Sequence, residues 1–478
     1  MATASQYDAV VVGSGPNGLS AAITLARAGR SVLVVEANDT IGGGTRSAAL
    51  TLPGFVHDVC SAIHPLGRSS PAFGGWPLAE HGLEWIEPPI ALGHPLDDGS
   101  AALISRDLVA SAASLGVDGE RYANLLGPVA RDWDLIAREL LGPFRLHGPL
   151  RHPFALGRFG LHAIQPVSLL IRRFRGPHAA AVLAGAGAHS FLRPEQLATG
   201  AFALSLLGAA HAVGWPIPRG GSQRIADALA SYLRSLGGEI RTGWRVESIR
   251  ELPPHRAVLL DLTPRQVLAI AGERLRGSYA RQLRRYRYGP GVFKIDLALD
   301  GPIPWADPDL VRAGTVHLAG TAQEVGASAR AVARGRIPKR PMVLLAQPSL
   351  FDSTRAPAGQ HVVWAYCHIP NGSNADMTEP ILAQLERFAP GVRQRILGRS
   401  TMDPAAIEAF NANHVGGDIN GGLQDVRQLF TRPAMRWDPY STPDPGIFIC
   451  SSSTPPGGGV HGLCGWHAAR SALRGVLG

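Results

Sequence analysis

The sequence predicts an α/β fold in which one parallel sheet is assembled from separate stretches of the chain. An apolar run from Ala9 leads into a glycine-rich turn and a helical stretch, and a second apolar run then ends at Glu36. Two more short apolar runs lie far along the chain, one starting at Ala257 and one just before Ser451. Such runs are typical of strands that are buried on both faces of a sheet.

The glycine-rich turn has the spacing Gly-x-Gly-x-x-Gly and stands between a strand and a helix. Gly13 permits the tight turn, Gly15 lets the backbone approach a pyrophosphate, and Gly18 lets the helix pack closely on the strand. Pro16 and Asn17 open the helix, whose free N–H groups and positive dipole end would point at the phosphates. The turn therefore predicts a dinucleotide site, and a purely structural glycine-rich turn is the alternative.

Glu36 ends the second apolar run, eighteen residues beyond Gly18. Its carboxylate can accept both hydroxyl groups of an adenosine ribose, and it disfavours the 2′-phosphate of NADP. The acid alone does not distinguish NAD from FAD.

Two further glycine clusters favour FAD. Gly42–Arg46 follows shortly after Glu36, and Pro455–Gly462 precedes a final helical stretch. The first cluster would let backbone lie against a flavin ring. The last helix would direct its N-terminus at the pyrimidine edge of the ring, where negative charge develops on reduction. A flexible loop is the alternative for the second cluster. The residues predicted to contact FAD are Gly13, Gly15, Pro16, Asn17, Gly18, Glu36, Gly43, Gly44, Thr45, Arg46, Val246, Ser452, Gly458, Gly459, Val460 and His461.

The chain resembles two-domain FAD oxidoreductases of the phytoene desaturase and amine oxidase type. The resemblance rests on five segments that span nearly the whole sequence: YDAVVVGSGPNGLSAAITLARAG, VVEANDTIGGGTRS, YGPGVFKIDLALDGPIPW, VGGDINGG and STPPGGGVHGLCGWHAA. One departure is that many such proteins carry an Asp after the last strand, reaching the ribityl chain. Here three serines follow that strand, and we expect the hydroxyl of Ser452 to replace the contact.

Between the predicted parallel strands, apolar residues recur either at helical spacing or in alternation. From about Arg106 to Ala212 apolar residues recur at helical spacing, which predicts a helical cap. Gln196–Pro218 carries no charged residue, but its glycines and prolines argue against a membrane span, and we expect a buried helix that lines an apolar cavity. From Gly291 onward, apolar residues alternate with other residues, which predicts strands of a second sheet.

These patterns predict an interrupted Rossmann-like FAD-binding domain and a substrate domain with a mixed sheet and a helical cap. The FAD-binding domain is expected to comprise residues 1–75, 213–275 and 436–478, and the substrate domain residues 76–212 and 276–435.

Lys294 is the first candidate for a catalytic residue. The resemblance to amine oxidases implies a lysine that holds a water near the flavin N5 and assists proton traffic or oxygen reduction. The alternative is an exposed strand lysine paired with Asp296. His461 is the second candidate, for contact with the ring or proton transfer, and its alternative is a histidine that bonds backbone at a helix N-terminus.

The composition of the chain limits the classes of binding partner that we expect. The net charge of +9 at pH 7 comes almost wholly from arginine, since Lys294 and Lys339 are the only lysines. None of the arginine clusters is interleaved with a recognised stacking platform or nucleic-acid motif, so we expect no nucleic-acid partner, and a peripheral contact with an anionic membrane surface fits them better. The four cysteines form no Cys-x-x-Cys pair, and we expect neither a redox disulfide nor a metal site.

The N-terminus shows no signal peptide, which predicts a cytoplasmic protein. Nothing in the sequence indicates the oligomeric state.

The sequence therefore predicts an FAD-dependent oxidoreductase, of the dehydrogenase or desaturase kind, acting on a largely apolar small molecule. No second Gly-x-Gly-x-x-Gly follows a strand, so we expect the electrons to pass to oxygen, a quinone or another carrier. The alternatives are a flavin amine oxidase and a regulatory or binding flavoprotein without turnover.

Overall fold

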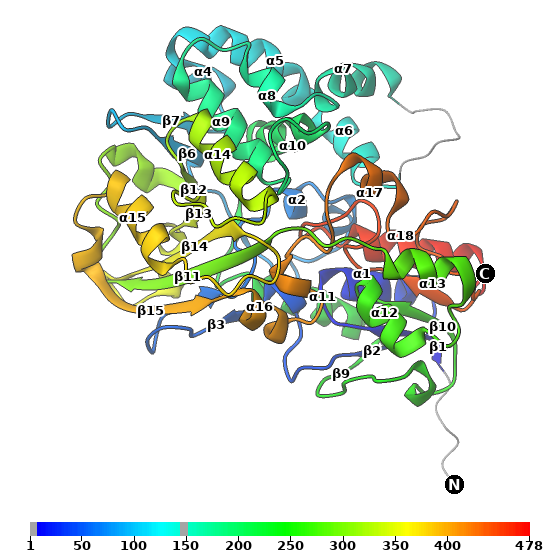
Figure 1. The fold of residues 1–478 in the computed structure, drawn as a ribbon. Coiled ribbons are helices and arrows are strands. Elements are labelled where there is room, and N and C mark those ends of the chain that lie inside the picture. The colour runs from blue at the N-terminus through cyan, green and yellow to red at the C-terminus, as the bar shows by residue number, and fades with distance from the viewer. Residues whose placement is uncertain (1–6, 144–151) are drawn as a thin grey trace.

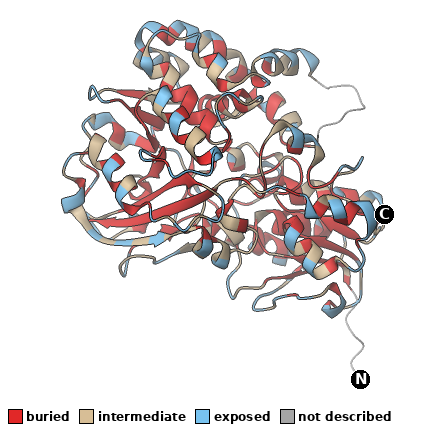
Figure 2. Cartoon of the chain, viewed as in Figure 1, coloured by how far each residue is buried: buried red, intermediate tan, exposed pale blue. Residues whose placement is uncertain are grey.

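The computed structural model describes residues 7–143 and 152–478. Two large sheets lie side by side, with a layer of helices above one of them (Figure 1). Buried residues concentrate in the strands of both sheets (Figure 2).

The first sheet has five strands in the order β16-β10-β1-β2-β9, and all its pairs are parallel. Its strands come from both ends and the middle of the chain: β1 (Tyr7–Val12), β2 (Val32–Val35), β9 (Glu239–Arg241), β10 (His255–Leu260) and β16 (Ile447–Ile449). The sheet is completed by the last strand of the chain, as the apolar runs predict.

Helices cover both faces of this sheet, which explains the unbroken apolar strands. One face packs against α1 (Pro16–Arg27), α11 (Gln223–Ser235) and α18 (Leu463–Arg474). The other face packs against α12 (Pro264–Ala271) and α13 (Gly277–Arg284). Because α13 shares the core of this sheet, the first domain extends a few residues past position 275 in its packing.

The second sheet is mixed and has seven strands in the order β15-β11-β14-β13-β12-β6-β7. Only the β12–β6 pair is parallel. The strands are β6 (Ile90–Pro95), β7 (Ala101–Ile104), β11 (Gly291–Leu299), β12 (Ala313–Leu318), β13 (Val343–Ala346), β14 (His361–Ile369) and β15 (Ile396–Met402). All nine residues of β11 are buried, including its lysine and aspartate.

The helical cap consists of α4 to α10 and lies beside β6 and β7 (Figure 1). Its central member, α10, packs on α5, α7 and α9. The cap helices are α4 (Leu108–Ser114), α5 (Gly119–Arg131), α6 (Trp133–Leu140), α7 (Pro153–Ala163), α8 (Val167–Ile171), α9 (Pro177–Ala188) and α10 (Thr199–Val213). Among the described residues, none of the helices has both the length and the apolar character needed to cross a bilayer.

Shorter elements connect these layers. They are β3 (Ser47–Ala48), β4 (His57–Asp58), β5 (Trp85–Ile86), β8 (Ile217–Pro218), α2 (Pro65–Arg68), α3 (Pro71–Gly74), α14 (Ala322–Ala333), α15 (Thr378–Phe388), α16 (Pro404–Phe410) and α17 (Val426–Thr431).

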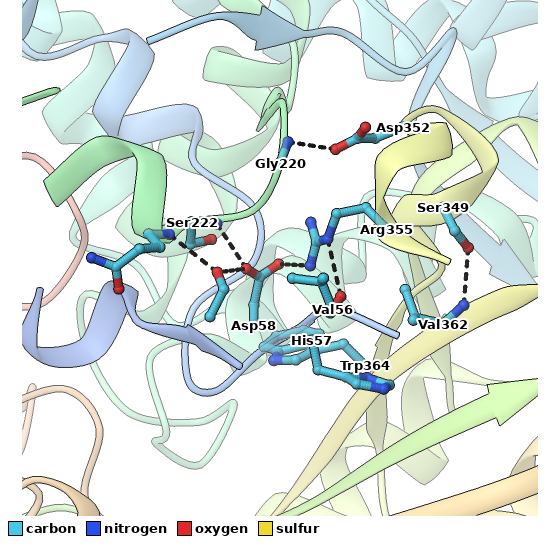
Figure 3. A network of polar contacts seen from close by, with 12 residues as sticks. Val56, His57, Asp58, Gly220, Ser222, Ser349, Asp352, Arg355, Val362 and Trp364 are labelled. Carbon is cyan, nitrogen blue, oxygen red and sulfur yellow. Dashed lines mark hydrogen bonds and ion pairs between the residues drawn. The ribbon is translucent and has the colours of Figure 1, made fainter. Parts of the chain in front are cut away.

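A buried ion pair joins the two regions (Figure 3). The carboxylate of Asp58 accepts hydrogen bonds from Arg355 Nη2 at 2.8 Å, Ser47 Oγ at 2.7 Å and the backbone N–H of Ser222 at 2.7 Å. Burial opposes ionisation of Asp58, but the Arg355 charge and these hydrogen bonds hold its pKa below the ordinary value. Arg355 also donates to the carbonyl of Val56 at 3.0 Å. These contacts fix the β3–β4 hairpin between the sheets.

Candidate active site

A single cavity of about 800 Å³ extends from the glycine-rich turn after β1 to the inner face of the second sheet. Of the sixteen residues predicted to contact FAD, all but Gly18 line this cavity. A Cβ on Gly18 would lie 2.0 Å from the carbonyl oxygen of Gly13. Gly18 therefore acts through helix packing, as its place in the turn predicts.

The backbone of the glycine-rich turn lies close to the backbone of the second glycine cluster. Gly13 has a φ of +104°, which L side chains rarely adopt. Across the turn, a Cβ on Gly43 would lie 3.1 Å from the Cα of Gly15, so the first two glycine clusters lie against each other. The two clusters therefore form adjoining parts of the cavity lining.

Glu36 is buried at the end of β2, and both its carboxylate oxygens already accept hydrogen bonds. Ser14 donates through its N–H at 2.9 Å and its hydroxyl at 2.7 Å, and Asn38 donates through its N–H at 3.0 Å and its amide at 2.8 Å. Burial opposes ionisation, but these donors hold the pKa of Glu36 below its ordinary value. The acid is thus fixed as a carboxylate that lines the cavity.

Arg46 lines the cavity but is also held by its surroundings. Its Nη2 donates to the carbonyl of Phe410 at 2.6 Å, and its guanidinium lies 3.7 Å from the centre of the Phe410 ring. The side chain is therefore positioned before any ligand binds.

His461 lies in the loop before α18 and is fully buried. Its Nδ1 accepts a hydrogen bond from the backbone N–H of Leu463 at 3.0 Å. Burial lowers the pKa of His461 to about 4, against the opposing effect of nearby carbonyls at Gly457 and Gly458. The ring is neutral and caps the first turn of α18 while lining the cavity.

Lys294 does not line the cavity. It forms a buried ion pair with Asp296, and Asp296 Oδ1 lies 3.4 Å from His57 Nδ1. The alternative of an exposed lysine is wrong, because only 3% of the side chain is exposed. The β4 strand lies over this part of the sheet, so the alternation along β11 reflects burial by a distant segment. The catalytic role of Lys294 stays a prediction.

Cys60 lies close enough to Lys294 to feel its charge. It lines the cavity, and burial raises the pKa of its thiol to about 11, although the charges of Lys294 and Arg46 oppose this shift. All four cysteines are free thiols, and no group of three metal-ligating side chains occurs in residues 7–143 and 152–478.

Asp261 is a site residue that the sequence reasoning missed. It follows β10 directly, lines the cavity, and accepts a hydrogen bond from the N–H of Gly18 at 2.9 Å. Burial raises its pKa to about 7. Asp261 could have been predicted from the sequence, because it stands at the carboxyl end of a parallel strand, where ligands of open α/β sheets bind.

The far wall of the cavity, formed by the second sheet and α10, carries no charged side chain, although Glu139 of α6 also lines the cavity. The wall is built from the inner face of β12 to β14 and from α10, with additional aromatic residues from neighbouring loops. Its residues include Thr315, Leu344, Trp364, Tyr366, Ala201, Phe202, Ser205, Leu206, His189 and Trp215. The charge-free stretch 196–218 thus supplies a cavity-lining helix, which confirms that prediction.

Comparisons with known proteins agree with this geometry. Residues 11–74 match the family model of the NAD(P)-binding Rossmann-like domain. A 45-residue segment is 60% identical to putrescine oxidase of Kocuria rosea. Among solved structures, an oxidoreductase from Methanosarcina mazei has a TM-score of 0.65 at 17% identity, with 98% of this chain and 100% of that chain covered. Wild-type putrescine oxidase bound to putrescine has a TM-score of 0.61 at 17% identity, covering 98% of both chains.

The Rossmann-like domain and the cavity that it opens into are those of an oxidoreductase, and the fold is shared with solved amine oxidases. Over nearly its whole length, the chain is similar to Pyridine nucleotide-disulfide oxidoreductase domain-containing protein 2 of Rattus norvegicus, at 26% identity over 98% of this chain and 94% of the relative. It is also 24% identical to 4,4'-diapolycopene oxygenase of Methylomonas sp, over 94% of each chain. The predicted fold class and resemblance are confirmed.

Proposed function

We propose that the protein binds FAD and removes hydrogen from a largely apolar small molecule. The observation that carries this proposal is the continuity of the cavity, which joins a dinucleotide-type glycine turn to an uncharged wall of aromatic and aliphatic side chains. A site for hydrogen removal needs the reacting carbon held next to the cofactor in a pocket that excludes water.

The glycine contacts fit an extended dinucleotide. At Gly15 a Cβ would lie 2.9 Å from Asp261 Oδ2, and at Gly458 it would lie 2.9 Å from Asn420 Oδ1, so larger residues would close the cavity wall at both places. Gly13 and Gly15 would hold the diphosphate at the N-terminus of α1, and Glu36 would hold the adenosine ribose. Bound FAD would supply a ring that accepts a hydride.

Three further parts of the chain would enclose that ring. Gly43 and Gly44 would offer backbone to one part of it, Ser452 would contact the ribityl chain, and Gly458–His461 would lie at its pyrimidine edge. The N-terminus of α18 would favour negative charge at that edge.

The uncharged far wall supports an apolar substrate over an amine. Burying an ammonium group without a carboxylate partner is strongly unfavourable. Among the described cavity-lining residues of the second sheet and α10 there is neither Asp nor Glu, and Glu139 of α6 is a cavity-lining carboxylate outside this wall. The amine oxidase alternative rests on the lysine of β11, which lies outside the cavity lining.

We further propose that the outer face of α7 contacts an anionic membrane surface. Phe154 and Leu161 lie seven residues apart on this face and are 91% and 69% exposed. The inner face of the same helix lines the cavity through Phe159. Arg172 and Arg175 are exposed just beyond α8 and suit anionic headgroups. An apolar substrate would then pass from the membrane into the cavity beside this helix.

The experiment that tests the redox function is anaerobic mixing of the purified protein with a panel of lipids, terpenoids and amines, followed by visible absorbance. We expect a yellow protein whose flavin bleaches with a terpenoid or lipid and not with amines. Bleaching and hydrogen peroxide release with amines alone would establish the amine oxidase alternative. A yellow protein that no compound bleaches would favour a flavoprotein without turnover. Folded protein that stays colourless in excess FAD would contradict the whole proposal.

A further inference from the structure

The far wall of the cavity carries a polar spot within its apolar surface. Thr315 lines the cavity and is 3% exposed, yet its hydroxyl oxygen has no hydrogen-bond partner among the described residues. A buried hydroxyl that makes no hydrogen bond carries an uncompensated desolvation cost. A ligand group that bonds this hydroxyl would recover that cost.

A histidine pair lies next to Thr315. His317 is two residues further along β12, so both side chains share one face of the sheet, about 7 Å apart along the strand. His317 Nε2 lies 3.0 Å from Nε2 of His189, which caps the C-terminus of α9 and lines the cavity. The polar spot therefore consists of the unbonded hydroxyl of Thr315 and the imidazole of His189, which is positioned by its contact with His317.

The pair is uncharged at neutral pH. Burial lowers the pKa of His189 to about 4, and burial together with the neighbouring histidines lowers the pKa of His317 well below its ordinary value. Between two neutral imidazoles, one Nε2 must donate and the other accept. When His189 donates, its Nδ1 is an acceptor, and when it accepts, its Nδ1 carries a proton. Nδ1 of His189 can thus accept a hydrogen bond from a ligand hydroxyl or donate one to a ligand carbonyl.

The two indole groups of the wall are already bonded within the protein. The indole of Trp364 donates to the carbonyl of Cys60 at 3.0 Å, and the indole of Trp215 donates to the carbonyl of Leu206 at 3.1 Å. A carboxylate or ammonium would find no opposite charge on this wall. The polar spot suits an uncharged oxygen.

We propose that Thr315 and His189 form a subsite for a carbonyl or hydroxyl oxygen of an otherwise apolar substrate. This inference rests on the proposed function, because it assigns the substrate class of the same cavity. The substrate is then an oxygenated apolar molecule, such as a terpenoid ketone or alcohol, in place of a pure hydrocarbon. The oxygen would fix the orientation of the carbon skeleton in the cavity.

Carvone and limonene provide a matched pair of probes, because they share one carbon skeleton and carvone adds a carbonyl. Both are volatile, so headspace gas chromatography over solutions of the full-length holoprotein gives the free concentration and hence each Kd. We compare the wild type with Thr315→Val, which removes the hydroxyl at similar size, and with Thr315→Ser, which keeps it.

We expect Thr315→Val to weaken carvone binding about tenfold, the value of one buried hydrogen bond, and to change limonene binding less than twofold. Thr315→Ser should stay within about threefold of the wild type for carvone. Equal effects of Thr315→Val on both probes, no effect on carvone, or no carvone binding by the wild type would each overturn the subsite. The measurement needs no flavin reduction. Selective carvone binding without bleaching by any compound would therefore retain the subsite and refute the redox function.

Discussion

The carboxylate of Asp261 accepts a hydrogen bond from the backbone N–H of Gly18 at 2.9 Å, at the N-terminus of α1. An acid thus stands beside the position where the diphosphate of a dinucleotide would lie. Burial raises its pKa to about 7, so a large fraction of the molecules carry the neutral acid near neutral pH. The proton removes a negative charge that would oppose the diphosphate.

Asp261→Asn should stabilise the protein more at pH 8 than at pH 5, by at least about 1 kcal/mol. The folded protein retains the Asp261 proton up to about pH 7, whereas the unfolded chain loses it near the ordinary carboxyl pKa. The stability contributed by the neutral acid is therefore lost as the pH rises from about 4 to 7. Thermal unfolding at both pH values measures the difference, with the exposed Asp309→Asn as control. A pH-independent gain would refute the raised pKa.

Gly18→Ala should weaken FAD binding at least about tenfold, because the added methyl group would collide with the carbonyl of Gly13 and displace α1 from the phosphate position. Fluorescence titration of flavin-free protein with FAD measures the Kd. Gly74→Ala is the matched control, since a Cβ there meets no atom within 4 Å. Equal affinities of the two variants would contradict the packing role of Gly18.

Lys294→Met in an Asp296→Asn background should retain bound flavin and slow its reoxidation at least about tenfold, if a lysine-held water assists oxygen reduction as in amine oxidases. The paired change is needed because removing the lysine alone would leave Asp296 buried without its partner, at a cost of about 3–5 kcal/mol. Stopped-flow absorbance after mixing with oxygen gives the rate, and the wild type, in which the pair is intact, is the reference. An unchanged rate would remove Lys294 from catalysis and leave it a structural role.

Arg355→Met should lower the free energy of unfolding by about 3–5 kcal/mol, because Asp58 would remain buried and unpaired (Figure 3). The double change Arg355→Met with Asp58→Asn should recover more than half of this loss. Urea midpoints followed by circular dichroism measure both variants. A double variant no more stable than Arg355→Met would show that the guanidinium contributes through its contact with Val56.

Replacing Phe154 and Leu161 by serine should reduce binding to phosphatidylglycerol vesicles at least about fivefold, because the apolar face of α7 would no longer enter the lipid interface. Cosedimentation measures the bound fraction. Val109→Ser is the control, since Val109 is equally exposed on α4. Wild-type protein that stays in the supernatant, or equal binding of both variants, would contradict the membrane proposal.

Local patterns account for the parts of the fold and site that the sequence predicts well. The glycine turn and Glu36 are defined by residues within thirty positions of each other, and the first sheet is visible because helices on both faces keep its strands apolar. The uncharged stretch 196–218 likewise predicts a cavity-lining helix.

Long-range pairing explains what the sequence does not predict. Alternation along β11 places Lys294 and Asp296 on an apparently polar face, but His57 comes from a segment more than two hundred residues away and covers them. Asp58 and Arg355 are likewise buried only because they meet each other.

The order of strands in the first sheet also constrains how the protein is made. β1 leaves the ribosome more than four hundred residues before β16 and α18. The apolar surface of α1 that faces α18 stays uncovered until α18 has been synthesised. Nascent chains should therefore depend on chaperones up to that point, and products that terminate before α18 should be targets for proteolysis.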